Sequence, residues 1–186
     1  MIQEGTTLKN EIREKISTVE QEHGVELSTI QKILLCIKGP ITDILDVLYG
    51  EMNLFMLTQR FEDADEHAAE LLNINEGSPI SFRESIVHKN GRPLVYAKSY
   101  IPLERCSERV IRDLKGEVMT TGKILDRNDN ETVRVVSKIS IETPTAIQKE
   151  LFKTDEPMLS REYQMIHKKQ IVIWTKESYP LNYFNE

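Results

Sequence analysis

Two observations predict an α+β domain built on a single, mainly antiparallel sheet of six strands with helices packed on one face. The first is an internal repeat, because residues 78–104 align without a gap on residues 156–182 at an offset of 78 positions. The second is the order of patterns in each half, which runs strand, helix, and then two strands joined by a turn. Strands connected in this way pair locally, and one sheet face is buried under helices.

The two copies keep identical residues at matched positions and keep apolar character where identity is lost. The identical pairs are Pro79/Pro157, Arg83/Arg161, Glu84/Glu162, Lys98/Lys176, Pro102/Pro180 and Leu103/Leu181. In the first copy Asn90-Gly91 supplies residues that tolerate positive φ in a tight hairpin turn. The second copy has Lys168-Lys169 there, so we expect its turn to differ.

The predicted domain covers residues 1–186, with N-terminal helices in 1–50, a first repeat half in 52–104, a connecting segment in 105–130 and a second repeat half in 131–184. Leu8, Ile12, Ile16 and Val19 are spaced as on one face of an amphipathic helix.

Helix-start signals follow. Ser28 and Gln31 have the spacing of a capping box, which begins a second helix that ends at Gly39-Pro40. Thr42 is expected to cap a third helix over residues 43–49. Further strands are predicted at 53–60 and 131–142, and further helices at 64–72, 107–116 and 145–152.

The composition, 39% hydrophobic and 29% charged, is that of a soluble globular protein. No apolar run approaches the roughly 20 residues that cross a bilayer, and Met1-Ile2-Gln3-Glu4 does not resemble a signal peptide, so we expect a cytoplasmic protein without a membrane partner. The net charge of −6 argues against nucleic acid as the main partner. An anionic substrate would need a local cluster of basic residues.

The last predicted strand places a carboxylate among apolar side chains. Alternation puts Ile171, Ile173, Thr175 and Glu177 on one face, and Val172, Trp174, Lys176 and Ser178 on the other. Ser99 is the counterpart of Glu177 in the first copy, so one half has a carboxylate where the other has a small hydroxyl. Glu177 is either a buried functional group or a residue at the solvated end of the strand, paired with a surface lysine.

Arg83 and Arg161 occupy the same point of both copies. A guanidinium is well shaped to bind a carboxylate through two hydrogen bonds. The alternative is that each arginine pairs with a structural glutamate such as Glu84 or Glu162. An arginine and Glu177 facing one cavity would combine an anion anchor with a proton-transfer group.

Signals for other kinds of chemistry are missing from the sequence. The four histidines do not have metal-ligand spacing, and there is neither a glycine-rich phosphate loop nor a nucleophile elbow. An enzyme with this sequence is expected to work without a metal or an organic cofactor.

At this point the sequence resembles the chorismate pyruvate-lyase family, in the branch of small archaeal and mycobacterial-type proteins that form 4-hydroxybenzoate. The resemblance runs from about Leu27 to Phe184. Its motifs are Leu34-Leu35 followed by Gly39-Pro40-Ile41-Thr42, Phe82-Arg83-Glu84, the segment 93–102, the segment 121–125 and Thr175-Lys176-Glu177-Ser178-Tyr179-Pro180. It implies an antiparallel sheet with helices and a closed ligand cavity.

The resemblance also implies site residues. Arg83 stands where family members bind a carboxylate of chorismate or of the aromatic acid product, and Glu177 stands where they carry an essential glutamate. Backbone contacts are implied from Ile41 and from Thr121, which precedes Gly122. Bacterial members commonly have Met and Leu at these two positions, so the resemblance implies that the backbone contacts are kept and that the pocket has a different shape here.

Two further cations, Arg161 and Lys123, are candidates for binding the second carboxylate of chorismate.

A second reading is a non-catalytic module that binds an aromatic or anionic effector, related to the sensor domain of GntR-type regulators. Those proteins add a winged-helix DNA-binding domain, whereas only about fifty residues precede the first predicted strand here, and residues 43–49 contain two acids and no Lys or Arg. Replacing Glu177 distinguishes the readings, because a lyase would lose turnover and a sensor would lose at most some affinity.

Overall fold

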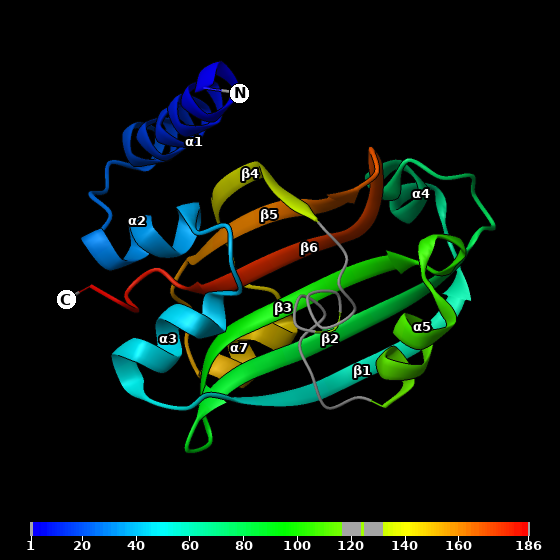
Figure 1. Ribbon diagram of the computed structural model, residues 1–186. Helices are drawn as coiled ribbons and strands as arrows, with labels where there is room; N and C mark the ends of the chain where they lie inside the picture. The colour runs from blue at the N-terminus through cyan, green and yellow to red at the C-terminus, as the bar shows by residue number, and fades with distance from the viewer. Residues whose placement is uncertain (1, 117–123, 125–131, 186) are drawn as a thin grey trace.

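The computed structural model describes residues 2–116, 124 and 132–185, with the backbone alone over residues 2–9. The predicted α+β class is confirmed, since the described residues form α-helices around one six-stranded sheet in which every strand pair is antiparallel (Figure 1). The strands are β1 (Asn53–Asp63), β2 (Pro79–Lys89), β3 (Arg92–Pro102), β4 (Val133–Glu142), β5 (Met158–His167) and β6 (Gln170–Pro180). The helices are α1 (Ile2–His23), α2 (Thr29–Cys36), α3 (Ile41–Tyr49), α4 (Glu66–Leu72), the 3₁₀ turn η1 (Leu103–Arg105), α5 (Glu108–Lys115) and α7 (Ala146–Phe152).

The order of the strands shows the internal repeat directly. It is β1-β2-β3-β6-β5-β4, so two three-stranded meanders meet where β3 pairs with β6. Lys98 and Lys176, which are equivalent in the repeat, lie directly opposite each other at this junction. A local two-fold pseudo-axis therefore passes between them and relates β2 to β5.

Helices cover both faces of the sheet, which differs from the predicted single covered face. On one face, here called the site face, α1, α2 and α3 bury Val87, Val95 and Tyr179. On the opposite face α4 packs on Phe82 and Trp174. In Figure 1, α2, α3 and α5 lie in front of the sheet and α4 and α7 behind it.

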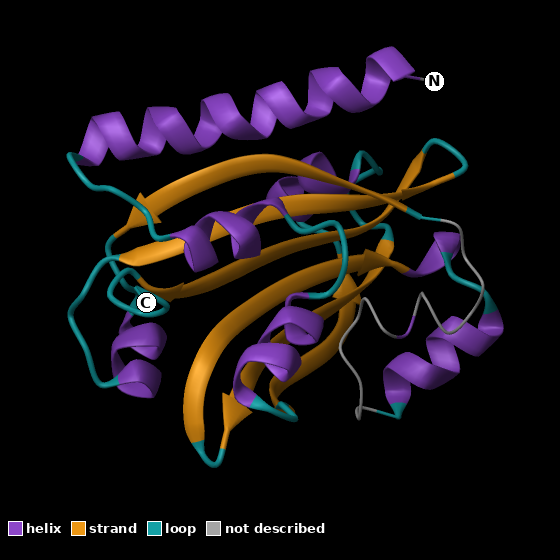
Figure 2. Cartoon of the chain, turned by 60° about the vertical axis from the view of Figure 1, so that its left-hand side comes forward, coloured by secondary structure: helices purple, strands orange, loops and turns teal. Residues whose placement is uncertain are grey.

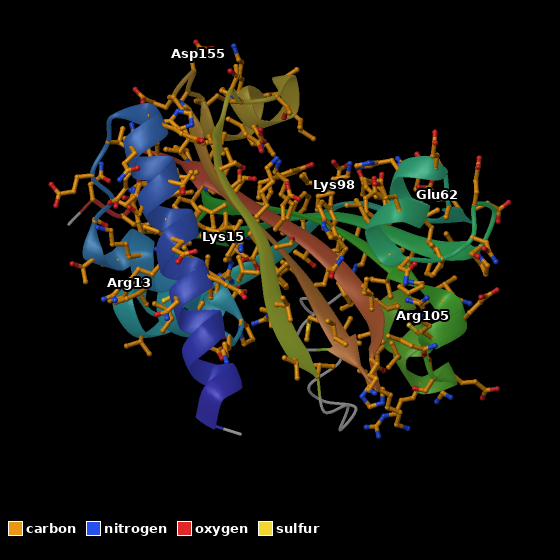
Figure 3. All side chains as sticks on the ribbon, turned by 90° about the horizontal axis from the view of Figure 1, so that it is seen from above. Arg13, Lys15, Glu62, Lys98, Arg105 and Asp155 are labelled. Atoms are coloured by element: carbon orange, nitrogen blue, oxygen red, sulfur yellow. The ribbon has the colours of Figure 1, made fainter. Side chains whose placement is uncertain are left out.

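The long helix α1 forms an outer layer that runs along β4, as the turned view in Figure 2 shows. Lys98 lies on the opposite face of the sheet, between α7 and α4 (Figure 3). The sheet needs helices on both faces because its central strands alternate two apolar sets, and each set must be buried.

Both hairpins carry a β-bulge at the same point of the repeat. The register shifts between Val87 and His88 in the first hairpin and between Met165 and Ile166 in the second. The bulge breaks the alternation at the start of β6. As a result Ile171 packs with the α4 cluster on the opposite face, and Val172 joins Ile173 in the cluster under α5. The predicted faces of Ile171 and Val172 were therefore wrong, whereas those of Thr175 and Glu177 are correct.

The two hairpin turns also adopt similar backbone conformations, which corrects the expectation that they differ. Asn90 and Gly91 have φ of 49° and 82°, and Lys168 and Lys169 have φ of 47° and 66°. Two consecutive residues with positive φ match the twist of the flanking strands. The second hairpin accepts lysines in the left-handed region because the strands on either side determine the turn.

The helix caps agree with the sequence except at α3. Ser28 forms the predicted capping box with Gln31 at the start of α2. At α3 the N-cap is Pro40, which provides no side-chain cap, and helix formation begins at Ile41. Thr42 is buried inside the first turn, so its predicted capping role was wrong. Pro40 is tolerated there because the first N–H groups of a helix lack partners within the helix.

Candidate functional site

A patch of polar side chains lies in the middle of the site face, between two apolar clusters. The cluster under α1, α2 and α3 covers one end of this face, and the cluster under α5, which includes Ile124, covers the other. Between them Arg83, Ser99, Thr175 and Tyr163 stand in register on β2, β3, β6 and β5, and we call these four residues the polar row. Each is at most 5% exposed. Buried polar groups of this kind have to be hydrogen-bonded to one another or to a ligand.

Glu177 lies next to the polar row and is buried, so the alternative of a solvated strand end is wrong. Its carboxylate accepts a hydrogen bond on each oxygen: from Arg161 Nε to Oε2 at 2.7 Å, and from the Tyr163 hydroxyl to Oε1 at 3.0 Å. Arg161 is directly opposite Glu177 on β5. An ionised carboxylate is an acceptor only, so both donors suit the charged form.

Arg161 connects Glu177 to the end of α2. Its Nη1 donates to the carbonyls of Leu34 at 2.6 Å and Ile37 at 3.1 Å. These carbonyls lie at the C-terminal end of the helix, where a cation is also favoured by the helix dipole. Burial lowers the pKa of Arg161, but the charge and hydrogen bond of Glu177, together with the neighbouring Tyr163 and Tyr179, outweigh burial, so the pKa of Arg161 is raised.

The hydrogen bonds of Arg161 decide which glutamate it pairs with. Glu162, the partner considered from the sequence, instead contacts Lys176 at 3.4 Å on the opposite face of the sheet. The third guanidinium nitrogen, Nη2, is buried and has no hydrogen-bond partner among the described residues.

Tyr163 was not predicted to be a site residue. Burial raises the pKa of its hydroxyl, and the charge of Glu177 raises it further, so the hydroxyl stays protonated and donates. Two guanidiniums lie against its ring, with Arg134 Cζ at 4.6 Å and Arg161 Cζ at 5.2 Å from the centroid. The repeat contained a signal for this residue, because its counterpart in the first copy is Ser85, an asymmetry like that between Glu177 and Ser99.

The first half of the sheet presents a different set of groups at equivalent positions. Arg83 is 2% exposed and lies opposite Ser99, just as Arg161 lies opposite Glu177. The Ser99 and Thr175 hydroxyls are 2.9 Å apart, and either can donate. The site face therefore carries Arg83 and the Ser99 hydroxyl on one side of the pseudo-axis, and an arginine, a tyrosine, a carboxylate and the Thr175 hydroxyl on the other.

The remaining predicted site residues are only partly located. Ile41 is buried at the start of α3, within the apolar cluster that borders the site. Thr121, Gly122 and Lys123 lie outside the described residues. The structure thus brings Arg83, Arg161 and Glu177 to one face of the sheet, and it places Ile41 at the border of the same region.

A cavity of about 630 Å³ lies elsewhere, between α1 and α2. It is lined by Ile12, Ile16 and Ile33 and by none of the predicted site residues. In the part of the chain that the structure describes, no group of three or more His, Cys, Asp or Glu is arranged to hold a metal ion. Within the same part, no helix is long and apolar enough to span a membrane.

The comparison with protein families identifies the class of protein, which is the chorismate pyruvate-lyase-like α+β proteins. Residues 35–185 match the family described as chorismate pyruvate-lyase Rv2949c-like, and the chain belongs to this family. A relative from Methanocaldococcus jannaschii, named "Putative lyase MJ0807", is 31% identical over 150 residues, which cover 77% of this chain and 73% of the relative.

Solved structures with a similar fold include a transcriptional regulator of the GntR family. PhnF from Mycobacterium smegmatis has a TM-score of 0.64 at 16% identity, covering 78% of this chain and 65% of PhnF. The effector domain of PhnF gives a TM-score of 0.59 at 18% identity, covering 76% of this chain and 88% of the domain. A GntR family regulator from Bacillus cereus gives 0.60 at 13% identity, covering 72% and 94%. At these identities the likeness concerns the fold alone.

Proposed function

We propose that this protein is a chorismate pyruvate-lyase, which eliminates pyruvate from chorismate and leaves 4-hydroxybenzoate. The observation that carries the proposal is the buried Glu177 carboxylate, held on both oxygens and placed on the same face as the buried Arg83. Membership of the chorismate pyruvate-lyase family supports the same reaction.

The chemistry assigns different tasks to the two residues. Chorismate has two carboxylates, and Arg83 binds one of them through its guanidinium. The strands that carry Arg83 and Glu177, β2 and β6, are two strand spacings apart, about 10 Å, and Glu177 lies two positions along β6 from Thr175, which is in register with Arg83. We propose that the ring of chorismate binds over this part of the site face, between the anchored carboxylate and the proton acceptor. Arg161 Nη2 is the donor proposed for the second carboxylate.

The elimination balances with proton transfer alone. Glu177 takes the ring proton from the carbon beside the ether carbon, and the electrons of that C–H bond form a new ring double bond. The C–O bond to the enolpyruvyl group breaks, and its electron pair leaves with the oxygen. The ring becomes aromatic, and the released enolpyruvate takes up a proton to give pyruvate. We therefore propose that neither a metal nor an organic cofactor is needed.

Positioning accounts for much of the proposed rate enhancement. A substrate held in a reactive geometry gains roughly 7–11 kcal/mol from orientation. A placed general base contributes about 10²–10⁴-fold. The apolar clusters on both sides of the polar row exclude water and support both effects.

The Glu177→Gln variant tests the role of the carboxylate. The amide keeps the shape of the side chain but cannot accept the ring proton, so kcat should fall about 10²–10⁴-fold while the protein still binds 4-hydroxybenzoate. Steady-state pyruvate release and calorimetric binding of 4-hydroxybenzoate measure the two quantities. A variant with the wild-type kcat would contradict the proposed role of Glu177.

A second candidate function is the binding of an aromatic or anionic effector without turnover. The similarity of the fold to the effector domain of PhnF and to a GntR family regulator, with TM-scores of 0.59 and 0.60, favours it. In that case Arg83 still anchors a carboxylate, but the wild-type protein releases no pyruvate. Affinity for chorismate or 4-hydroxybenzoate in a protein that lacks turnover would support this candidate.

A further inference from the structure

Two buried tyrosines on the site face differ in what their hydroxyls do. Tyr163 on β5 donates to Glu177 Oε1 at 3.0 Å. Tyr179 on β6 is more deeply buried than Tyr163, and its hydroxyl has no hydrogen-bond partner among the described residues. A buried hydroxyl without a partner is costly, so the contact of Tyr163 is a specific feature and not a general property of tyrosines in this core.

The carboxylate plane of Glu177 is fixed only if both of its oxygens are held. The terminal torsion of a glutamate is broad, so one hydrogen bond leaves the plane free to rotate. Arg161 holds Oε2 and Tyr163 holds Oε1, and the two donors together determine the direction of the remaining lone pairs. A proton acceptor has to present a lone pair along the C–H bond that it attacks.

The ring of Tyr163 is itself held in place. Arg134 Cζ lies 4.6 Å from its centroid, and Arg134 Nη1 donates to the Lys38 carbonyl at 2.5 Å. Arg161, which holds the other oxygen of Glu177, donates to the carbonyls of Leu34 in α2 and of Ile37 directly after it. Both donors to Glu177 are therefore linked to the segment that joins α2 to α3.

We propose that Tyr163 is a positioning residue for the lyase reaction, which orients the Glu177 carboxylate toward the ring proton of the substrate. This inference rests on the proposed function of Glu177 as the general base. Tyr163 acts through Glu177, so its removal should lower kcat and leave substrate binding nearly unchanged.

The experiment compares Tyr163→Phe with Tyr179→Phe, which is a matched control because both remove one buried hydroxyl from the same face. For Tyr163→Phe we expect kcat to fall about 10- to 100-fold, the range of one hydrogen bond to a charged group. The KM for chorismate should change less than about threefold, because Tyr163 is proposed to act on Glu177 and not on the bound substrate. For Tyr179→Phe both constants should stay within about twofold, since no hydrogen bond among the described residues is lost.

A pH profile separates positioning from packing. Without the Tyr163 donor the carboxylate is less stabilised in its charged form, so the acidic limb of kcat should move to higher pH. Introducing 3-fluorotyrosine at position 163 alone keeps the shape and gives a stronger donor, so the limb should move to lower pH. This second variant also serves if Tyr163→Phe does not fold.

The other buried charged or titratable groups on the site face do not explain such shifts. They are Arg83 on β2, Arg134 on β4, Arg161 on β5 and Tyr179 on β6, while α2 presents the Leu34 and Ile37 carbonyls. Guanidiniums remain charged in proteins, so the three arginines stay positive across the acidic range. Burial raises the pKa of Tyr179, so its hydroxyl stays neutral there.

The outcomes are distinct. Equal kcat values for Tyr163→Phe and Tyr179→Phe, or a rise in KM alone, would overturn the positioning role and leave the lyase intact. Absence of turnover in the wild-type protein would overturn the proposed function and the positioning role with it. A reduced kcat with an unshifted acidic limb in both Tyr163 variants would also overturn the inference, because that pattern indicates a packing defect.

Discussion

Removing Arg161 should destabilise the fold far more than removing a surface cation. The guanidinium is 0% exposed and the Glu177 side chain 8% exposed, so Arg161→Met leaves a buried carboxylate without its counter-charge. Breaking a buried ion pair from one side costs about 3–5 kcal/mol. The carbonyls of Leu34 and Ile37 lose their donor as well, each worth about 0.5–1.5 kcal/mol. Against a total stability of about 5–15 kcal/mol, this loss is a large fraction.

Urea unfolding at neutral pH measures the effect, and two further variants control it. Lys149→Met removes an ion pair with Asp155 in which the lysine side chain is 46% and the aspartate side chain 85% exposed. This variant should lower the free energy of unfolding by at most about 1 kcal/mol. The double variant Arg161→Met/Glu177→Leu removes both buried charges and should recover most of the loss, because well-packed apolar residues often replace a buried pair without cost.

Two results would refute the reasoning on Arg161. One is a loss below about 1 kcal/mol for Arg161→Met, which would mean that the pair is solvated or easily replaced. The other is a double variant as unstable as the single one, because the cost would then arise from lost packing and not from an uncompensated charge. High salt provides a further check, since a buried pair is screened less than an exposed one.

Two other predictions concern the second hairpin and the edge of the sheet. Lys169 has a φ of 66°, so Lys169→Gly should relieve left-handed strain and raise stability by about 0.5–1 kcal/mol in urea unfolding, and a decrease would contradict the turn conformation. Burial raises the pKa of Glu142, but hydrogen bonds from Lys176 and Ser140 and the charges of Lys176 and Lys138 together outweigh burial and leave the pKa below its usual value. Its contribution to stability is therefore present above the unfolded-state pKa of about 4.3 and lost as the pH falls through the lower folded-state value. Glu142→Gln should show a smaller acid-induced loss of stability than the wild type. An identical loss would contradict the stabilising role of the contact between Glu142 and Lys176.

Much of the architecture could be predicted from the sequence, because the repeat relates both the residues of the two halves and the way their strands pair. An offset of 78 positions relates Arg83 to Arg161 and Ser99 to Glu177, and the structure pairs these residues in the same way in both halves. The alternation of side chains correctly placed Glu177 on one face with Ile173 and Thr175, but it left open whether the carboxylate was buried or at a solvated strand end. Period-two patterns are reliable wherever the strand is regular.

The partner of Glu177 could not be predicted because it depends on a bulge. Without the register shift between Met165 and Ile166, a two-residue turn at Lys168-Lys169 would place Arg161 opposite Lys176. The extra residue moves the pairing by one position, so that Arg161 faces Glu177. Bulges depend on the packing of the whole sheet, and the local sequence does not specify them.

The prediction that helices cover one face of the sheet was wrong, because the face on which a helix packs is also not specified by the local sequence. The apolar residues of α4 show only that one side of the helix is buried, and they do not show which face of the sheet it packs against.

The site segment with Thr121, Gly122 and Lys123 lies outside the described residues, so its predicted contacts stay predictions.

The most direct test of the proposed function is to mix the purified wild-type protein with chorismate and to measure pyruvate and 4-hydroxybenzoate in the same samples. We expect equimolar release of the two products above the uncatalysed rate, and loss of that release in Glu177→Gln. Binding of chorismate without release of either product would contradict the lyase proposal and would favour an effector-binding module on the same fold.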